Sequence, residues 1–504
     1  MAKLGRLNPH TALPQGALAT LPSMTRTHEG AQAWTMDVQT ELFTLAVNNM
    51  VSEDTFYEKA KDRDARFAGL VRQAALQHPE WTAGLIGWLR SEANMRTASL
   101  VAACEYARSG APNSRTVVDK ACQRADEPGE ILSYWLGTYG RPILSAVKRG
   151  VADAAIRLYN EKSYVKWDSS GSSMRFGDVI DLVHPKPKAP WQASLFRRAL
   201  EDRHNRDKDL ASVPGVDGYK GWIRAGAPIE QLPHAATWEN VSAHHKMDAV
   251  AWEAIIPQMG YMALLRNLRN FEKAKVPAAM LSFVANKLAD PEEVAKSRQL
   301  PFRFWSAYKN SGTMRFGPTL ETALDLSIAN IPDFPGKTLV MVDTSDSMTS
   351  RLSAKSKISC MEAGVLFGAA VAAHSAPGSG LAMYATNVAG VKPQTSLLRT
   401  IEFVMQSSGV VGHGTNTWPA TKAVWDAQGP FDRIFIFTDG QSHPSTADQF
   451  VPKHVPVYTW HLGGYGNSDI QLGSGRYALA GLSDQSFKLV SILESGKNAG
   501  WPWE

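Results

Sequence analysis

Apolar positions along residues 30–330 recur every three or four residues, which is the period of an amphipathic α-helix. Five stretches show this period most clearly: 33–51, 66–78, 95–110, 142–161 and 247–274. In the fourth stretch Ile143, Val147 and Val151 share one face, and Pro142 suits the first helical turn, where its missing N–H costs nothing. No strand pattern stands out in this region. We therefore expect stacked antiparallel helices of the solenoid type.

The pattern changes after the proline-bracketed segment 331–337. Residues 338–343 are an apolar run rich in β-branched side chains, which is typical of a strand buried on both faces. Strand-like runs follow at 381–388, 433–437 and 455–461, with helical patterns at 361–374 and 397–407. This alternation predicts a doubly wound, mostly parallel sheet. The predicted organisation is an N-terminal arm (1–29), a helical-repeat domain (30–330) and an α/β domain (337–504).

Oxygen-bearing side chains follow several elements of the predicted α/β domain. Asp343, Ser345 and Ser347 come directly after the first strand, Thr415 follows a helix, and Asp439 follows the strand at 433–437. Ligands of such sheets bind beyond the carboxyl ends of the strands, and Mg²⁺ prefers hard oxygen ligands. An Asp-x-Ser-x-Ser run alone is also a common helix start. Because the Thr and the second Asp follow in order, the sequence favours a divalent-metal site, with Mg²⁺ as the expected ion.

Charge and composition change this picture only slightly. From residue 337 onward, 12 Lys and Arg balance 12 Asp and Glu, so the net charge of +5 lies in the first 336 residues, with 53 − 12 = 41 basic against 48 − 12 = 36 acidic side chains. This excess permits an anionic partner. The three cysteines are widely spaced, which fits reduced thiols in the cytoplasm and excludes a CxxC-type zinc site. No apolar run suits a signal peptide or a membrane span, so we expect a cytoplasmic protein without a membrane partner.

One short motif occurs twice in the helical region. Residues 170–177 (Ser-Gly-Ser-Ser-Met-Arg-Phe-Gly) resemble residues 311–317 (Ser-Gly-Thr-Met-Arg-Phe-Gly), and each copy is predicted to end a loop and open a helix. Either two helix-start signals coincide, or both loops lie on one rim of a curved solenoid and meet the same ligand.

Both predicted domains resemble known modules. Asp343-x-Ser345-x-Ser347, Thr415 and Asp439 match, position by position, the metal-ion-dependent adhesion motif of von Willebrand A domains. The helical region resembles the TROVE module of Ro-type proteins in residues 140–148, 159–162, 181–186 and 262–268, and residues 481–487 are similar as well. The sequence departs from the family pattern at Asn416, at the run 412–414 and at Phe176, where vertebrate Ro proteins have a histidine.

The resemblance implies a ring of HEAT-like helical repeats (an α solenoid) joined to a von Willebrand A-like domain. It implies that single-stranded 3′ ends of misfolded or non-coding RNA bind in a central hole and that Y-like RNA binds outside, while no DNA partner is expected. An exoribonuclease docks on the ring in some bacterial relatives. Basic side chains would then contact phosphates, with a solvated surface charge as the alternative for each one. The candidate RNA-binding residues are Arg141, Lys148, Lys162, Lys166, Arg175, His184, Arg266 and Arg269.

Two other functions remain open at this point. The first is an interaction module that grips a partner's carboxylate through the metal, on a helical scaffold that binds no RNA. The second is a metal-dependent nuclease. Two-metal nucleases use clustered carboxylates, however, and His413 is the only nearby histidine that could act as a base. There is no phosphate-binding Walker loop either. We therefore expect a non-catalytic ribonucleoprotein component.

Overall fold

The computed structural model describes residues 24–503 except 49–51, 53, 56, 170, 205–210, 312–314, 330, 353–355, 446–447, 474, 495–500 and 502. Residues 1–23 of the predicted N-terminal arm therefore lie outside the described residues. Below, "helical part" means residues 38–327 and "α/β domain" means residues 338–494.

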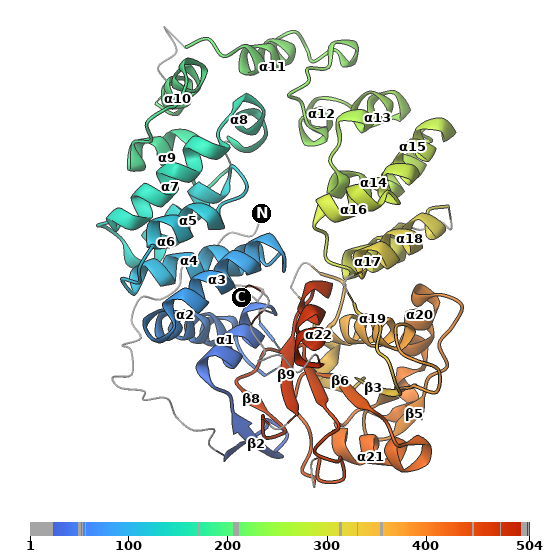
Figure 1. Cartoon of the computed structure of the whole chain (residues 1–504). Helices are drawn as coiled ribbons and strands as arrows, with labels where there is room; N and C mark the ends of the chain where they lie inside the picture. Colours follow the sequence, from blue (N-terminus) through green and yellow to red (C-terminus); the bar gives the residue numbers. More distant parts are fainter. Residues whose placement is uncertain are drawn as a thin grey trace.

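The helical part runs as an arc of helices with two limbs (Figure 1). The first limb, drawn in blue to green, contains α1 (Val38–Ala46), α2 (Ala60–Gln77), α3 (Pro79–Ser91), α4 (Arg96–Arg108), α5 (Ser114–Ala121), α6 (Glu127–Tyr139), α7 (Ser145–Leu158), α8 (Glu161–Trp167), α9 (Phe176–Val183) and α10 (Pro190–Arg203). After α11 (Pro214–Arg224), the second limb contains η1 (Ile229–Gln231), α12 (Trp238–His244), α13 (Ala249–Ile255), η2 (Ile256–Gln258), α14 (Tyr261–Lys273), α15 (Ala278–Leu288), α16 (Pro291–Ser297), α17 (Phe302–Ser311) and α18 (Gly317–Ser327).

Successive helices of the first limb pack closely on one another. The apolar stripe predicted for α7 is buried: Val147, Val151 and Ala154 are fully enclosed. α7 packs on α5 at a glycine, because a Cβ at Gly150 would lie 2.6 Å from the carbonyl oxygen of Arg115. The three- and four-residue spacing seen in the sequence therefore marks real contact faces of a solenoid.

The α/β domain contains a six-stranded sheet in the order β5-β4-β3-β6-β7-β9. Every neighbouring pair is parallel except β4 and β5. Helices cover both faces of the sheet, so the predicted doubly wound fold is confirmed. The elements are β3 (Thr338–Asp343), η3 (Asp346–Thr349), α19 (Cys360–Ala373), β4 (Gly380–Tyr384), β5 (Val388–Gly390), α20 (Leu397–Ser407), η4 (Ser408–Val411), α21 (Thr417–Gln428), β6 (Arg433–Thr438), β7 (Val457–His461), β8 (Asn467–Ser468), β9 (Arg476–Ala480), η5 (Asp484–Phe487) and α22 (Lys488–Glu494).

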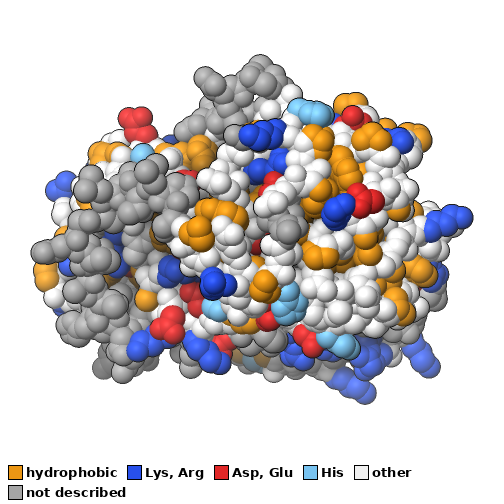
Figure 2. Space-filling model, turned by 90° about the horizontal axis from the view of Figure 1, so that it is seen from below, with side chains coloured by type: hydrophobic (Ala, Val, Ile, Leu, Met, Phe, Trp, Pro, Cys, Tyr) orange, Lys and Arg blue, Asp and Glu red, His pale blue; other side chains and the backbone are white. Residues whose placement is uncertain are grey.

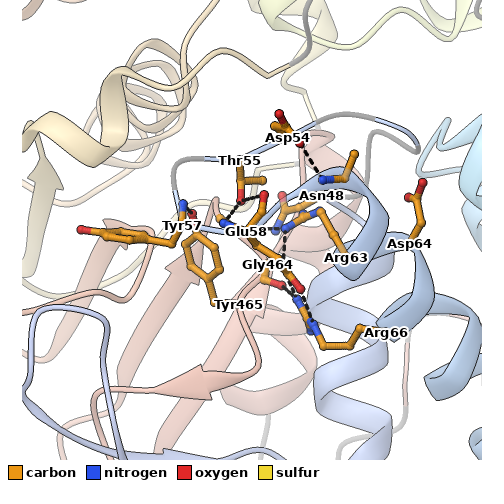
Figure 3. A network of polar contacts seen from close by, with 12 residues as sticks. Asn48, Asp54, Thr55, Tyr57, Glu58, Arg63, Asp64, Arg66, Gly464 and Tyr465 are labelled. Atoms are coloured by element: carbon orange, nitrogen blue, oxygen red, sulfur yellow. Dashed lines mark hydrogen bonds and ion pairs between the residues drawn. The ribbon is translucent and has the colours of Figure 1, made fainter. Parts of the chain in front are cut away.

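The α/β domain closes the arc into a ring, because both limbs contact it. α17 and α18 pack on α19 and α20, and α1 packs beside β9. Figure 3 shows another part of the contact between the first limb and the α/β domain, where side chains of α2 reach the loop after β7. Arg63 Nη1 donates to the carbonyl oxygen of Gly463 (2.7 Å), and Arg66 Nη2 donates to that of Gly464 (2.9 Å). Asn48 Nδ2 donates to the carbonyl oxygen of His461 (2.7 Å). The predicted fold class, a helical ring with a von Willebrand A-like domain, is confirmed.

The prediction of a single helix over residues 33–51 was wrong, and so was the prediction that residues 30–330 contain no strand. Residues 24–35 form an antiparallel hairpin of β1 (Met24–Arg26) and β2 (Gln32–Thr35). β2 also pairs with β8 of the α/β domain, with Trp34 opposite Ser468. α1 begins only after Asp37, whose side chain accepts hydrogen bonds from two backbone N–H groups of its first turn. The hairpin thus depends on a partner strand that is distant in the sequence.

Two further helix predictions were too long. The stretch 142–161 is helical only from Ser145, so Pro142 precedes the helix instead of opening it. Asn160 then caps α8 and separates it from α7. The stretch 247–274 is three elements, α13, η2 and α14, because Pro257 and Gly260 fall inside it. No helix in the described part of the chain combines the length and the apolar character needed to cross a membrane.

Asp64 lies in α2 beside the contact shown in Figure 3 and is almost fully buried. Burial raises its pKa to about 6 from a usual value of 3.8, although the backbone N–H of Ser52 donates to the carboxylate. Because the folded pKa is above the unfolded one, the fold loses stability as the pH rises from about 4 to about 6. We expect Asp64→Asn to increase the free energy of unfolding by about 1–2 kcal/mol near pH 7.5.

Urea unfolding at two pH values checks this prediction. The gain should largely vanish near pH 3, where the wild-type carboxyl group is mostly protonated in both states. An equal change at both pH values would show that charge burial at this position is not the cause.

Candidate functional site

The five residues predicted to bind a metal gather at the carboxyl edge of the sheet. Asp343 ends β3, Ser345 and Ser347 follow it at η3, Asp439 directly follows β6, and Thr415 lies between η4 and α21. All five are buried, with no more than 5% of any residue exposed. β3 and β6 are parallel neighbours, so the two carboxylates come from adjacent strand ends.

Hydrogen bonds fix the orientation of the first carboxylate. Asp343 Oδ1 accepts from the backbone N–H of Ser345 (2.9 Å), and Oδ2 accepts from Thr438 Oγ1 (2.6 Å). The hydroxyl oxygens of Ser345 and Ser347 lie 3.3 Å apart. One turn of chain thus presents a carboxylate and two hydroxyl groups together.

The loop that carries Thr415 is bonded to the loops on either side of it. The backbone N–H of His443, which follows the Asp439 loop, donates to the carbonyl oxygen of Thr415 (2.8 Å). The N–H of Asp346 donates to the carbonyl oxygen of His413 (3.1 Å). The three segments predicted to bind the metal are therefore held together by backbone contacts.

Three residues beside Thr415 hold this loop in place: Gly412, His413 and Asn416. Asn416 Nδ2 donates to the carbonyl oxygen of Thr386 (2.8 Å). Gly412 has φ = 86°, and a Cβ there would lie 2.8 Å from Thr386 Oγ1, so only glycine fits without strain. The His413 ring pairs with Asp346 Oδ1 (2.9 Å) at an exposed position. These residues shape the loop around Thr415.

The electrostatics of the two carboxylates favour a cation. Burial raises the pKa of Asp343, and burial together with the charge of Asp343 raises the pKa of Asp439 to about 7. Asp439 Oδ2 is buried and has no hydrogen-bond partner among the described residues. A divalent ion would supply that partner and offset the repulsion between the carboxylates. Two carboxylates and three hydroxyl groups fit the hard oxygen ligands that Mg²⁺ prefers.

Three of the predicted RNA-binding residues meet in one surface hollow. Arg141, Lys148 and His184 line a cavity of about 620 Å³ between the start of α7 and the end of α9. A second hollow shares Lys148 and His184 with the first. In neither hollow does an ion pair to Arg141, Lys148 or His184 occur among the described residues. We call the two together the α7–α9 hollow.

The α7–α9 hollow also contains basic residues that the sequence analysis missed: Arg115, Arg149 and Lys186. Arg115 pairs with Asp153 (2.6 Å), so it is partly neutralised. The signals for the other two were present, since Arg149 directly follows Lys148 and Lys186 ends one of the TROVE-like stretches.

Arg175 is engaged within the helical part. Its Nη2 lies 2.5 Å from Asp168 Oδ2, and the backbone N–H of Phe176 donates to the other oxygen of Asp168 (2.7 Å). The Phe176 ring stacks on Tyr159 at 3.7 Å between centroids. In this copy of the repeated motif, Arg and Phe therefore position the start of α9. Residues 312–314 of the other copy lie outside the described residues.

The remaining candidates lie elsewhere on the helical part. Lys162 and Lys166 are exposed on α8, where the Lys166 ammonium lies 4.8 Å from the Trp167 ring. Arg266 and Arg269 are exposed on α14, in the opposite limb of the arc (Figure 1). The sequence thus named basic positions in four places, and the structure brings only Arg141, Lys148 and His184 into one hollow.

The face of the α/β domain seen from below has a different character. Figure 2 shows basic side chains scattered over this face, with acidic and histidine side chains between them. This mixture agrees with the balance of 12 basic and 12 acidic residues after residue 336. The net positive charge of the chain lies in residues 1–336, which include the α7–α9 hollow.

Comparisons with known proteins identify part of the helical region. Residues 177–313 match the TROVE domain model. "Telomerase protein component 1" of Mus musculus is 34% identical over 133 residues, and that of Rattus norvegicus is 29% identical over 132 residues. Each match covers 26% of this chain and only 5% of the relative.

A solved structure resembles nearly the whole chain. It is the crystal structure of the Ro (RSR) protein of Deinococcus radiodurans, with a TM-score of 0.57 and 16% sequence identity. The match covers 87% of this chain and 95% of that one. At this identity the likeness concerns the fold, and the TROVE match adds a sequence likeness for residues 177–313 of the helical part. Residues 177–313 are therefore similar to a TROVE domain, and the chain as a whole has the fold of the Ro protein.

Proposed function

We propose that this protein is a non-catalytic RNA-binding component of a ribonucleoprotein. The observation that carries the proposal is the α7–α9 hollow, where Arg141, Lys148 and His184 converge beside the TROVE match at residues 177–313. His184 lies inside the matched region, as do Arg266 and Arg269. Basic side chains without ion-pair partners suit contacts to phosphates, which supply most of the affinity for single strands.

In finer detail, we propose that the ring receives single-stranded 3′ ends of non-coding or misfolded RNA and that a Y-like RNA binds its outer surface. An exoribonuclease is a further candidate partner, because a protein that holds an RNA end can present it for degradation. The metal site argues against hydrolysis by this chain, since it combines two carboxylates with three hydroxyl groups instead of the carboxylate cluster of two-metal nucleases. We propose Mg²⁺ as its ion and the cytoplasm as the location of the protein.

The purified protein is expected to bind single-stranded RNA with a strong dependence on salt. If three to five phosphates are neutralised, raising the salt from 50 to 200 mM should weaken binding roughly 20- to 100-fold, because counterions are released on binding. A filter-binding titration with a single-stranded oligonucleotide measures this slope. A duplex of the same sequence is the control. Absence of affinity for the single strand at low salt would contradict the proposal.

A second function is favoured by a separate observation: the buried Asp439 Oδ2 at the proposed metal site has no hydrogen-bond partner among the described residues. A metal held there with an open coordination position could bind a carboxylate of a protein partner while the helical part binds no RNA. The absorbance ratio of the purified protein at 260 and 280 nm distinguishes the two functions, because copurifying RNA raises it. Sequencing that RNA would identify the ligand.

A further inference from the structure

The hairpin turn between β1 and β2 lies against the loop that carries Asp439. Thr27 Oγ1 donates to the carbonyl oxygen of Ser442 (2.8 Å), 415 positions away in the sequence. The backbone N–H of His28 donates to Gln441 Oε1 (2.7 Å). Together with the β2–β8 pairing, these bonds place the turn at the rim of the metal site.

Glu29, in this turn, is held from one side by a phenol. The Tyr57 hydroxyl group donates a hydrogen bond to Glu29 Oε1, and the Tyr57 ring stacks on His28 with 4.6 Å between centroids. Figure 3 shows Tyr57 beside Tyr465, whose ring centroid lies 5.7 Å away. Burial, the hydrogen bond to Glu29 and the charge of Asp439 all raise the pKa of Tyr57, so the phenol lies near the predicted metal ligand Asp439.

On its other side, Glu29 faces a histidine. His443 Nδ1 lies 3.5 Å from Glu29 Oε2. The same residue donates its backbone N–H to the carbonyl oxygen of Thr415, and a Cβ on Gly414 would lie 2.9 Å from His443 Nε2. The Glu29 carboxylate therefore lies between a phenol near Asp439 and an imidazole beside the Thr415 loop.

The donor set at the sheet edge leaves room for one more oxygen ligand. Mg²⁺ takes six oxygens, and the five predicted residues give at most five if each binds through one atom. The buried Asp439 Oδ2, which has no hydrogen-bond partner in the part of the chain that the structure describes, points to a cation at this place. Glu29 is the carboxylate that the hairpin brings to the rim of the site, and 31% of its side chain is exposed.

We propose that Glu29 supplies, directly or through a water molecule, a carboxylate ligand to the metal from within the same chain. The inference rests on the proposed metal site. The metal then fastens the β1–β2 hairpin to the α/β domain, and Glu29 competes with any carboxylate that a protein partner could offer. A partner's carboxylate could then reach the metal only after it displaces Glu29 and the hairpin, so access to this coordination position is regulated.

The test uses the full-length protein and titrates Mg²⁺ alone by isothermal calorimetry. Glu29→Gln keeps the shape of the side chain and removes its charge, so it should weaken Mg²⁺ binding about tenfold. Millimolar acetate should restore much of that affinity in Glu29→Gln but change little in the wild type, where the position is filled. Glu239→Gln, an exposed glutamate on α12, is the matched control and should behave like the wild type.

Hydrogen exchange of residues 27–35 gives a second readout. Mg²⁺ should slow exchange there in the wild type and in Glu239→Gln but not in Glu29→Gln. Equal Mg²⁺ affinities of the wild type and Glu29→Gln, with equal responses to acetate, would overturn the proposal. Absence of Mg²⁺ binding in the wild type itself would instead overturn the metal site and this proposal with it. The two failures are therefore distinguishable.

Discussion

Replacing Asp343 by Ala is expected to abolish the stabilisation that Mg²⁺ gives to this protein while RNA affinity changes less than about twofold. Asp343 is buried at the end of β3, and both its carboxylate oxygens are oriented by hydrogen bonds, from Ser345 and from Thr438. An ion at a hundred times its dissociation constant stabilises the folded state by about 2.7 kcal/mol. For a domain of this size that corresponds to roughly 5–10 °C in the melting temperature.

The expected loss is complete because the substitution removes one of the two buried carboxylates among the five predicted ligands. Asp346→Ala is the matched control: it removes a carboxylate from the same loop, but one that is 64% exposed and paired with His413. This control should keep the full Mg²⁺ response. Thermal melts with Mg²⁺ or EDTA measure stability, and filter binding measures RNA affinity.

Three results would contradict the interpretation of this site. A Mg²⁺ response that persists in Asp343→Ala would show that the ion binds elsewhere. A folded Asp343→Ala variant that no longer binds RNA would show that the metal site and the RNA-binding surface are not separate. If Asp346→Ala also lost the Mg²⁺ response, the response would depend on the loop as a whole and could not be assigned to the five predicted ligands.

The sequence predicted best what depends on local pattern. The strand at 338–343 is found at the predicted bounds because a strand buried on both faces is an uninterrupted apolar run. The helix at 397–407 is found at its predicted bounds as well, because its period of apolar residues is regular. The five predicted ligands could be placed together because each lies at or after the end of an element, and the carboxyl ends of parallel strands meet at one edge. That a metal binds there stays a prediction.

The sequence failed where distant partners decide the structure. Residues 32–35 are a strand because β1 and β8 pair with them, and the apolar spacing around Ala33 and Trp34 carries no sign of those partners. The same reason hid Glu29 and Tyr57 from the analysis of the metal site, since both are far in sequence from Asp439. Arg175 looked like a free cation, but its partner Asp168 becomes apparent only once α8 and α9 are placed.

Reversing the charges of Arg141 and Lys148 together is expected to weaken single-stranded RNA binding by at least about fiftyfold at low salt. Both side chains line the α7–α9 hollow and neither has an ion-pair partner there among the described residues. The variant Arg141→Glu/Lys148→Glu would remove two cations and place two anions where phosphates are expected. The loss should therefore exceed that of the double alanine variant, and the slope of affinity against salt should fall by about 1–2.

Folding is not expected to suffer, because Arg141 is exposed and Lys148 lies off the buried stripe of α7. Lys392→Glu together with Lys337→Glu is the matched control, since both lysines are exposed in or beside the α/β domain and the net charge changes equally. If this control weakens RNA binding as much as Arg141→Glu/Lys148→Glu does, overall charge and not the hollow determines the affinity. If the α7–α9 variant binds like the wild type while Arg266→Glu/Arg269→Glu does not, the RNA-binding surface lies on α14 in the opposite limb. Only a loss confined to the α7–α9 variant assigns phosphate contacts to the hollow, because the charge change is the same in all three pairs.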